Sequence, residues 1–81
     1  MSLVDLEGFF LKEKAELGDA MAQNNLGVMY RDGEGVEQNF KEAVKWFQKS
    51  ADQGDADAQS NLGFMYHQGQ GVEQGFKEAF K

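Results

Sequence analysis

Apolar side chains recur along this chain with the spacing of an α-helix rather than that of a β-strand. In the segment 20–31 the shared face consists of Ala22, Gln23, Leu26, Met29 and Tyr30, at spacings of three and four residues, which is typical of one side of a helix. In the segment 40–53 the corresponding stripe consists of Phe40, Ala43, Val44, Phe47 and Ala51. The pattern predicts an all-α fold with helices at residues 3–17, 20–31, 40–53, 56–67 and 76–81.

Residues that favour helix starts stand directly before three of these helices. Asp19 and Asp55 precede two of them, where a short acidic side chain accepts a hydrogen bond from the first turn. Asn39 precedes the third and is followed three residues later by Glu42, which is the pattern of a capping box. These residues support the predicted boundaries.

Glycine rather than proline is expected to end the helices, because the chain has 10 glycines and no proline. Gly18 and Gly54 are predicted to end helices in the left-handed conformation. The loop 32–38 contains two more glycines, which permit a sharp reversal between paired helices. Gly27 and Gly63 lie inside helices, where glycine costs about 1 kcal/mol relative to alanine, and we expect them to allow a close backbone approach within each helix pair.

The sequence repeats itself at a shift of 36 residues. Of the 31 positions compared between residues 15–45 and 51–81, 21 are identical. A fixed period of this length is typical of a solenoid of stacked helical units. We therefore expect one repeat domain over residues 1–81, divided into a capping helix at 1–18, a first repeat at 19–54 and a second, truncated repeat at 55–81.

Composition narrows the classes of partner. The 81 residues carry 14 acidic and 8 basic side chains, a formal charge of −6, which repels phosphate backbones, so we expect no nucleic-acid partner. No apolar run approaches the roughly 18 residues of a membrane span, so we expect no membrane partner. Cysteine is absent. The N-terminus lacks a signal-peptide pattern, which slightly favours a cytoplasmic location. A periplasmic or secreted protein whose signal peptide had been removed would show the same N-terminal sequence.

Three features invite a chemical interpretation, and each has a simpler one. Gly33-x-Gly35 follows a predicted helix rather than a strand, so it reads as a turn and not as a phosphate loop. Asp32 and Glu34 of the same loop are replaced by glutamine in the second copy, which favours a solvated turn over a calcium site. His67 is the only histidine, and no nucleophile stands at a catalytic spacing from it. We expect no cofactor, no metal site and no catalytic residue.

Two stretches carry the signature of a known family. Ala20 to Val36 reads Ala-x-Ala-Gln-x-x-Leu-Gly-x-x-Tyr-x-x-Gly-x-Gly-Val, and this pattern recurs from Ala56 to Val72. In these residues, and in the Trp46 that follows the first stretch, the chain resembles the Sel-1-like repeat, a relative of the tetratricopeptide repeat. The resemblance implies antiparallel helix pairs stacked as a right-handed superhelical solenoid, whose first helices line a concave groove that holds peptide or protein partners. Trp46 is predicted to pack between adjacent units.

The first helices of the two units differ at four positions only. These positions are offset by 0, 3, 7 and 10 residues, which places them on one stripe of the helix, opposite Leu26 and Tyr30. With the groove that the resemblance implies, the predicted partner-binding residues are Met21, Asn24, Val28, Arg31, Asp57, Ser60, Phe64 and His67. Leu26 and Tyr30 are expected inside, whereas Val28 and Phe64 are expected to be exposed on an isolated unit. Two other interpretations stay open: neutral drift at exposed positions, and contact of some stripe residues with the neighbouring helix.

The resulting functional prediction is a non-enzymatic scaffold for protein–protein contact. A purely structural spacer is one alternative. Cysteine-rich relatives of the family, which have been linked to cell-wall or β-lactam chemistry, imply another, and the lack of cysteine disfavours it. The helix predicted at 76–81 is too short to cover the helix at 56–67. Either the chain is part of a longer repeat array, or a second copy covers this helix, and we expect a homodimer or a domain-swapped oligomer.

Overall fold

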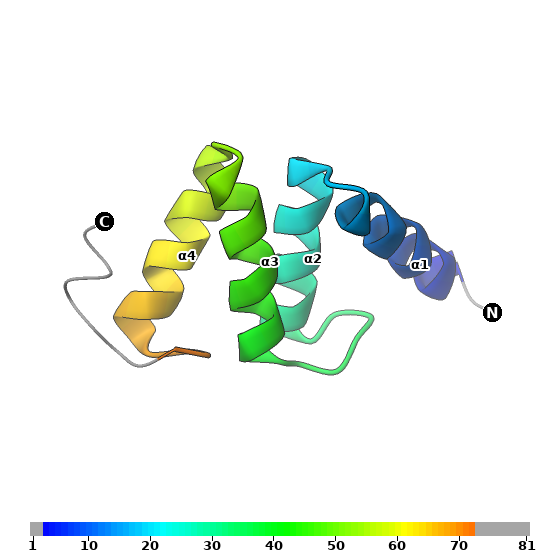
Figure 1. Cartoon of the computed structure of the whole chain (residues 1–81). Helices are drawn as coiled ribbons and strands as arrows, with labels where there is room; N and C mark the ends of the chain where they lie inside the picture. Colours follow the sequence, from blue (N-terminus) through cyan, green and yellow to red (C-terminus); the bar gives the residue numbers. More distant parts are fainter. Residues whose placement is uncertain (1–2, 73–81) are drawn as a thin grey trace.

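The computed structural model describes residues 3–72, which form a row of α-helices joined by short loops (Figure 1). The helices are α1 (Leu3–Glu16), α2 (Ala20–Asp32), α3 (Phe40–Asp52) and α4 (Ala56–Gln68). Helices α1 and α4 lie at opposite ends of the row, with α2 and α3 packed side by side between them (Figure 1). No strand occurs in this range. The predicted all-α, solenoid-like fold is confirmed, and the helix predicted at 76–81 lies outside the described residues.

Aspartate caps start two of the helices as the sequence predicts. The Asp19 Oδ1 accepts a hydrogen bond from the backbone N–H of Ala22, with 2.9 Å between nitrogen and oxygen. One repeat later, Asp55 Oδ1 accepts from the N–H of Ala58 at the same distance. Each bond satisfies one of the free N–H groups that a helix leaves in its first turn. The two copies therefore share their helix-starting chemistry as well as their sequence.

The capping box predicted at the start of α3 forms only in part. Asn39 Oδ1 accepts a hydrogen bond from the backbone N–H of Glu42 at 3.1 Å, as expected. The reciprocal bond is not made, because the Asn39 backbone N–H donates to the Tyr30 carbonyl oxygen at 2.9 Å. The Glu42 carboxylate instead lies 3.4 Å from Lys45 Nζ. The residue before α3 thus ties this helix to the end of α2.

Two glycines end helices in the left-handed conformation that the sequence predicts. Gly18 has a φ of 100° and Gly54 a φ of 90°. Their backbone N–H groups donate to the carbonyl oxygens of Ala15 and Ala51, at 3.1 and 2.9 Å. Both bonds satisfy carbonyl groups that the last turn of a helix leaves without a partner.

The interior consists of two apolar clusters, one on each side of the α2–α3 pair. The first joins α1, α2 and α3 through Ala15, Ala22, Leu26 and Trp46. The second joins α3 and α4 through Ala43, Phe47 and Met65, with side chains of α2 packed against it. Leu26 is 1 % exposed and the half-buried Tyr30 packs against both clusters. Both residues lie inside, as predicted.

Gly27 lets the ring of Phe47 reach the backbone of α2. A Cβ atom at this position would lie 2.6 Å from both Cδ1 and Cε1 of Phe47, far inside ordinary contact distance. Phe47 itself is fully buried, so its ring has no free space to move into. The predicted close approach within the helix pair is therefore present, but a side chain of α3 makes it rather than its backbone.

Glutamine side chains link each unit to the helix before it. Gln23 Nε2 donates to the carbonyl oxygen of Ala15 at 3.0 Å. The same bond recurs one repeat later, where Gln59 Nε2 donates to the carbonyl oxygen of Ala51 at 3.3 Å. Both acceptors belong to the last turn of a helix, whose carbonyl groups have no partner within the helix. The same hydrogen bond therefore joins each repeat unit to the helix that precedes it.

Trp46 packs between adjacent units, as predicted. Its side chain is 4 % exposed and lies in the cluster with Ala15 of α1 and Leu26 of α2. The ammonium groups of Lys45 and Lys49 lie 5.1 and 4.7 Å from the ring centroid, a distance at which a cation is attracted to an aromatic face. Trp46 therefore joins α1 to the α2–α3 pair.

Candidate functional site

The eight predicted partner-binding residues lie on α2 and α4, the first helices of the two units. We refer to them as the α2–α4 face: Met21, Asn24, Val28 and Arg31 on α2, and Asp57, Ser60, Phe64 and His67 on α4. Five of the eight side chains are exposed, and three are partly or fully covered. The face is therefore part surface and part contact between units.

Two large apolar side chains of the α2–α4 face are open to solvent. Met21 is 70 % exposed and Phe64 is 53 % exposed. Asp57, Ser60 and His67 are exposed as well. Exposed aromatic and methionine side chains are enriched at protein–protein contacts. For these five residues the outward orientation expected from the sequence is confirmed.

The remaining three members, Asn24, Val28 and Arg31, turn toward the neighbouring helix. Val28, which is expected outside on an isolated unit, is half-buried here and packs against the cluster that contains Phe47 and Met65, in line with the open interpretation that some of these residues contact the neighbouring helix. Asn24 is only 9 % exposed, and Arg31 is half-buried. The cause is the stacking of α4 against the α2–α3 pair, which covers positions that would be exposed on an isolated unit.

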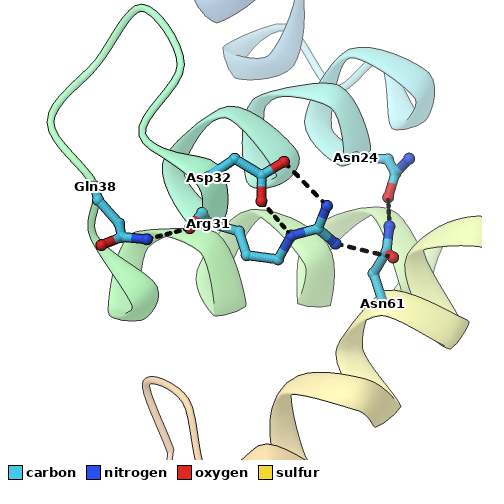
Figure 2. A network of polar contacts seen from close by, with 5 residues as sticks. All are labelled: Asn24, Arg31, Asp32, Gln38 and Asn61. Atoms are coloured by element: carbon cyan, nitrogen blue, oxygen red, sulfur yellow. Dashed lines mark hydrogen bonds and ion pairs between the residues drawn. The ribbon is translucent and has the colours of Figure 1, made fainter.

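Asn61 of α4 connects two members of the face through hydrogen bonds (Figure 2). Its Nδ2 donates to Asn24 Oδ1 at 3.0 Å. Its Oδ1 accepts from Nη1 of Arg31 at 3.3 Å. One amide side chain thus bridges two positions that lie two turns apart on α2, and it ties the first helices of successive units together by polar contacts.

Arg31 is held in place from its other side by Asp32. The Arg31 Nε and Nη2 donate to the two carboxylate oxygens of Asp32, at 2.9 and 3.2 Å (Figure 2). These hydrogen bonds raise the pKa of Arg31 and lower the pKa of Asp32, so both groups are charged at neutral pH. Gln38 Nε2 also donates to the Arg31 carbonyl oxygen at 2.8 Å. The guanidinium group is therefore hydrogen-bonded on two sides, to Asp32 and to Asn61.

The difference between the two copies does not point to Asn61, because Asn61 is identical to Asn25 at the matching position of the first unit. Asn61 contacts the preceding unit, whereas Asn25 is exposed. The sequence feature that points to this contact between units is an asparagine that is identical in both copies and directly precedes Leu26 or Leu62.

A comparison with protein families finds the same repeat that the geometry shows. A sequence profile of the Sel1 repeat matches residues 20–55 and again residues 56–81. The chain belongs to the Sel1 repeat family. Proteins of this family generally mediate protein–protein contacts. A stretch of 40 residues, which makes up 49 % of this Sel1 repeat chain, is 48 % identical in sequence to a putative Sel1-like repeat-containing protein of Acanthamoeba polyphaga mimivirus.

Solved structures of other Sel1-type proteins share the fold. A Sel1 repeat protein from Oxalobacter formigenes is 39 % identical, matches 93 % of this chain and has a TM-score of 0.88. A protective antigen of uropathogenic Escherichia coli is 40 % identical, matches 89 % and has a TM-score of 0.87. Cysteine-rich protein B of Helicobacter pylori is 26 % identical, matches 89 % and has a TM-score of 0.84.

The Sel1 repeat chain is much shorter than these proteins. It spans 7 % of the mimivirus protein, 31 % of the Oxalobacter structure, 15 % of the Escherichia structure and 54 % of the Helicobacter structure.

Within residues 3–72, no helix combines the length and apolar character needed to cross a membrane. Among the same residues, no group of three or more His, Cys, Asp or Glu side chains is placed to hold a metal ion.

Proposed function

We propose that this Sel1 repeat chain is a scaffold that binds a peptide or protein partner at the α2–α4 face, which would form the concave side of the solenoid. The observation that carries the proposal is the exposure of Met21 and Phe64, at 70 % and 53 %. Both are large apolar side chains on the first helix of a unit, and both stand where the two copies differ. Packing fixes the buried side of each first helix, whereas exposed positions that differ between the copies are free to determine which partner is bound.

The proposal includes no catalytic role. The chain has one histidine and no cysteine, and His67 and Ser60 are surface residues of the proposed binding face. A nucleophile needs an adjacent base and a group that orients the base. Binding alone accounts for the exposed residues.

Charge substitutions on the α2–α4 face are expected to weaken partner binding strongly without unfolding the chain. The probe is a peptide selected against the immobilised chain from a phage-displayed library of random sequences. Phe64→Asp and Met21→Asp should each weaken binding of this peptide about tenfold or more, because each places a charge where an apolar side chain is desolvated in the complex. Fluorescence anisotropy with a labelled peptide measures the affinity.

Leu17→Asp is the matched control for these two variants. Leu17 is also apolar and is 87 % exposed, but it lies after the end of α1 and outside the α2–α4 face. Its substitution should change the affinity less than about twofold, since it removes no contact with the partner. Equal losses for all three variants, or a loss for Leu17→Asp alone, would place binding elsewhere. Failure to select any peptide would favour a structural spacer.

Self-association is a second candidate, and the face of α1 supports it. Phe10 stands in the register of Trp46 but is 56 % exposed, whereas Trp46 is 4 % exposed beneath α1. Phe9 beside it is 53 % exposed, and the two rings meet edge to face. A second copy would cover these rings. Sedimentation velocity should then show dimers that Phe10→Asp dissociates, and a monomer at high concentration would contradict this candidate.

A further inference from the structure

The outer side of α1 carries a short stripe in which two apolar side chains enclose two charges. Its members stand at positions i, i+3, i+4 and i+7, which share one face of a helix. All four side chains are exposed, and we refer to them as the outer stripe: Phe10, Glu13, Lys14 and Leu17. Leu17 follows the last residue of α1, but its N–H still donates to the Glu13 carbonyl oxygen at 3.0 Å, so it continues the helical turn.

Apolar side chains gather on this side of α1. Of the five large hydrophobic side chains that are exposed among the described residues, three are Phe9, Phe10 and Leu17. The ring centroids of Phe9 and Phe10 lie 5.8 Å apart, so the two rings form one continuous patch. Exposed patches of this kind mark contacts with other molecules. Because α1 forms one end of the row of helices (Figure 1), a second molecule can reach the patch without any rearrangement.

The two charges of the outer stripe have no partner within the described part of the chain. The ion pairs found there join other residues. Glu13 and Lys14 cannot pair well with each other, because consecutive side chains on a helix point about 100° apart. The two instead lie on opposite flanks of the line that joins Phe10 to Leu17. A helix that docks on this line would meet one acidic and one basic flank.

This arrangement is complementary to a second copy of itself when the two helices run in parallel. A two-fold axis along the helices sets Glu13 of each copy beside Lys14 of the other, while Phe10 and Leu17 each face their own counterparts. An antiparallel pair would set Glu13 beside Glu13 and Lys14 beside Lys14, and like charges oppose association. Charges that flank an apolar seam select the orientation of paired helices in this way.

We propose that the chain forms a parallel dimer through the outer stripe of α1. Phe10 and Leu17 provide the apolar contact, and Glu13 and Lys14 set the orientation. This inference rests on the self-association described under the proposed function, and it specifies the surface and the arrangement of the second copy. Since α1 has 14 residues and is about 21 Å long, the interface is smaller than that of a stable dimer, and association is weak and depends on concentration.

Reversal of one charge should weaken the dimer, and reversal of both should restore it. Glu13→Lys and Lys14→Glu each set like charges side by side across the axis, so each should raise the Kd of the dimer about tenfold or more. The double variant Glu13→Lys/Lys14→Glu exchanges the two charges and should return to within about twofold of the parent. Sedimentation velocity over a concentration series up to about 1 mM measures the Kd, and circular dichroism checks that each variant is folded.

Net charge predicts a different result, which makes the test sharp. The chain has a formal charge of −6, so Glu13→Lys would favour association if general repulsion between acidic chains were decisive. The matched control for Lys14→Glu is Lys12→Glu, which makes the same change at an exposed position on the other side of the helix. It should change the Kd less than about twofold. Equal losses for the two lysine variants would overturn the pairing.

A disulfide reports the orientation directly, because the chain has no cysteine of its own. Leu17→Cys should link two chains in a glutathione redox buffer, since residue 17 meets its counterpart only in the parallel dimer and a disulfide needs Cα atoms within about 7 Å. Lys12→Cys, on the other side of α1, should stay monomeric under the same conditions. A link that forms only in a mixture of Leu17→Cys and Phe10→Cys would show an antiparallel pair instead.

The outcomes separate this inference from the proposals on which it builds. A dimer without recovery in the double variant, or with an antiparallel link, would overturn the parallel arrangement and leave self-association in place. A monomer up to about 1 mM would overturn both. The proposed binding at the α2–α4 face is measured separately with the selected peptide, whose affinity Glu13→Lys should change less than about twofold, because Glu13 lies outside that face.

Discussion

Phe47→Ala is expected to lower the free energy of unfolding by about 3–5 kcal/mol, the range observed when a buried phenylalanine is cut back to alanine. Phe47 is fully buried, lies against Gly27 of α2 and belongs to the cluster that holds Met65 of α4. Its removal therefore loosens both neighbours of α3 at once. A domain of this size has a total stability of only about 4–12 kcal/mol, so the substitution should remove a large fraction of it.

Urea unfolding followed by far-ultraviolet circular dichroism measures this loss. Phe10→Ala is the control, because it removes the same side chain from α1 at a position that is 56 % exposed. An exposed side chain gives up little burial, so the control should cost less than about 1 kcal/mol. Similar losses for the two variants would show that Phe47 is not the centre of the packing between units.

Gly27→Ala is expected to destabilise the chain by about 1–3 kcal/mol, although alanine is the better helix former. On propensity alone the change would stabilise α2 by up to about 1 kcal/mol. The added Cβ would lie 2.6 Å from two atoms of the Phe47 ring, and a fully buried ring cannot move away without disturbing its neighbours. Overpacking should therefore outweigh propensity. Thermal or urea unfolding gives the sign directly.

Gly8→Ala is the matched control for this substitution. Gly8 is also inside a helix, but a Cβ there would meet only the Cε atom of Met29 at an ordinary 3.7 Å. It should stabilise α1 by up to about 1 kcal/mol. Phe47→Leu should cost less in the Gly27→Ala background than in the parent, because a smaller side chain relieves the overlap. Stabilisation by both glycine variants would contradict the contact with Phe47.

The sequence predicted the helices well because their ends are determined locally. Asp19 and Asp55 cap the first turns, and Gly18 and Gly54 take the left-handed conformation after the last ones. These interactions depend on residues within a few positions of one another. They can be recognised without knowing how the helices pack.

The binding face was predicted less completely, because burial there depends on stacking between units. Val28 and Phe64 occupy equivalent positions, yet Val28 packs against the cluster with Met65 while Phe64 is 53 % exposed. Asn24 is covered as well and is bonded to Asn61, 37 residues along the chain. Helical periodicity describes one helix at a time, so it cannot show which exposed positions a neighbouring unit will cover.

Nuclear magnetic resonance of the ¹⁵N-labelled chain, titrated with the selected peptide, tests the central claim most directly. We expect the largest shift changes in α2 and α4, and among the side-chain amides the Asn24 signal should move while the exposed Asn25 signal stays in place. Shift changes confined to α1 and α3, with the signals of Met21, Asn24 and Phe64 unchanged, would contradict binding at the α2–α4 face.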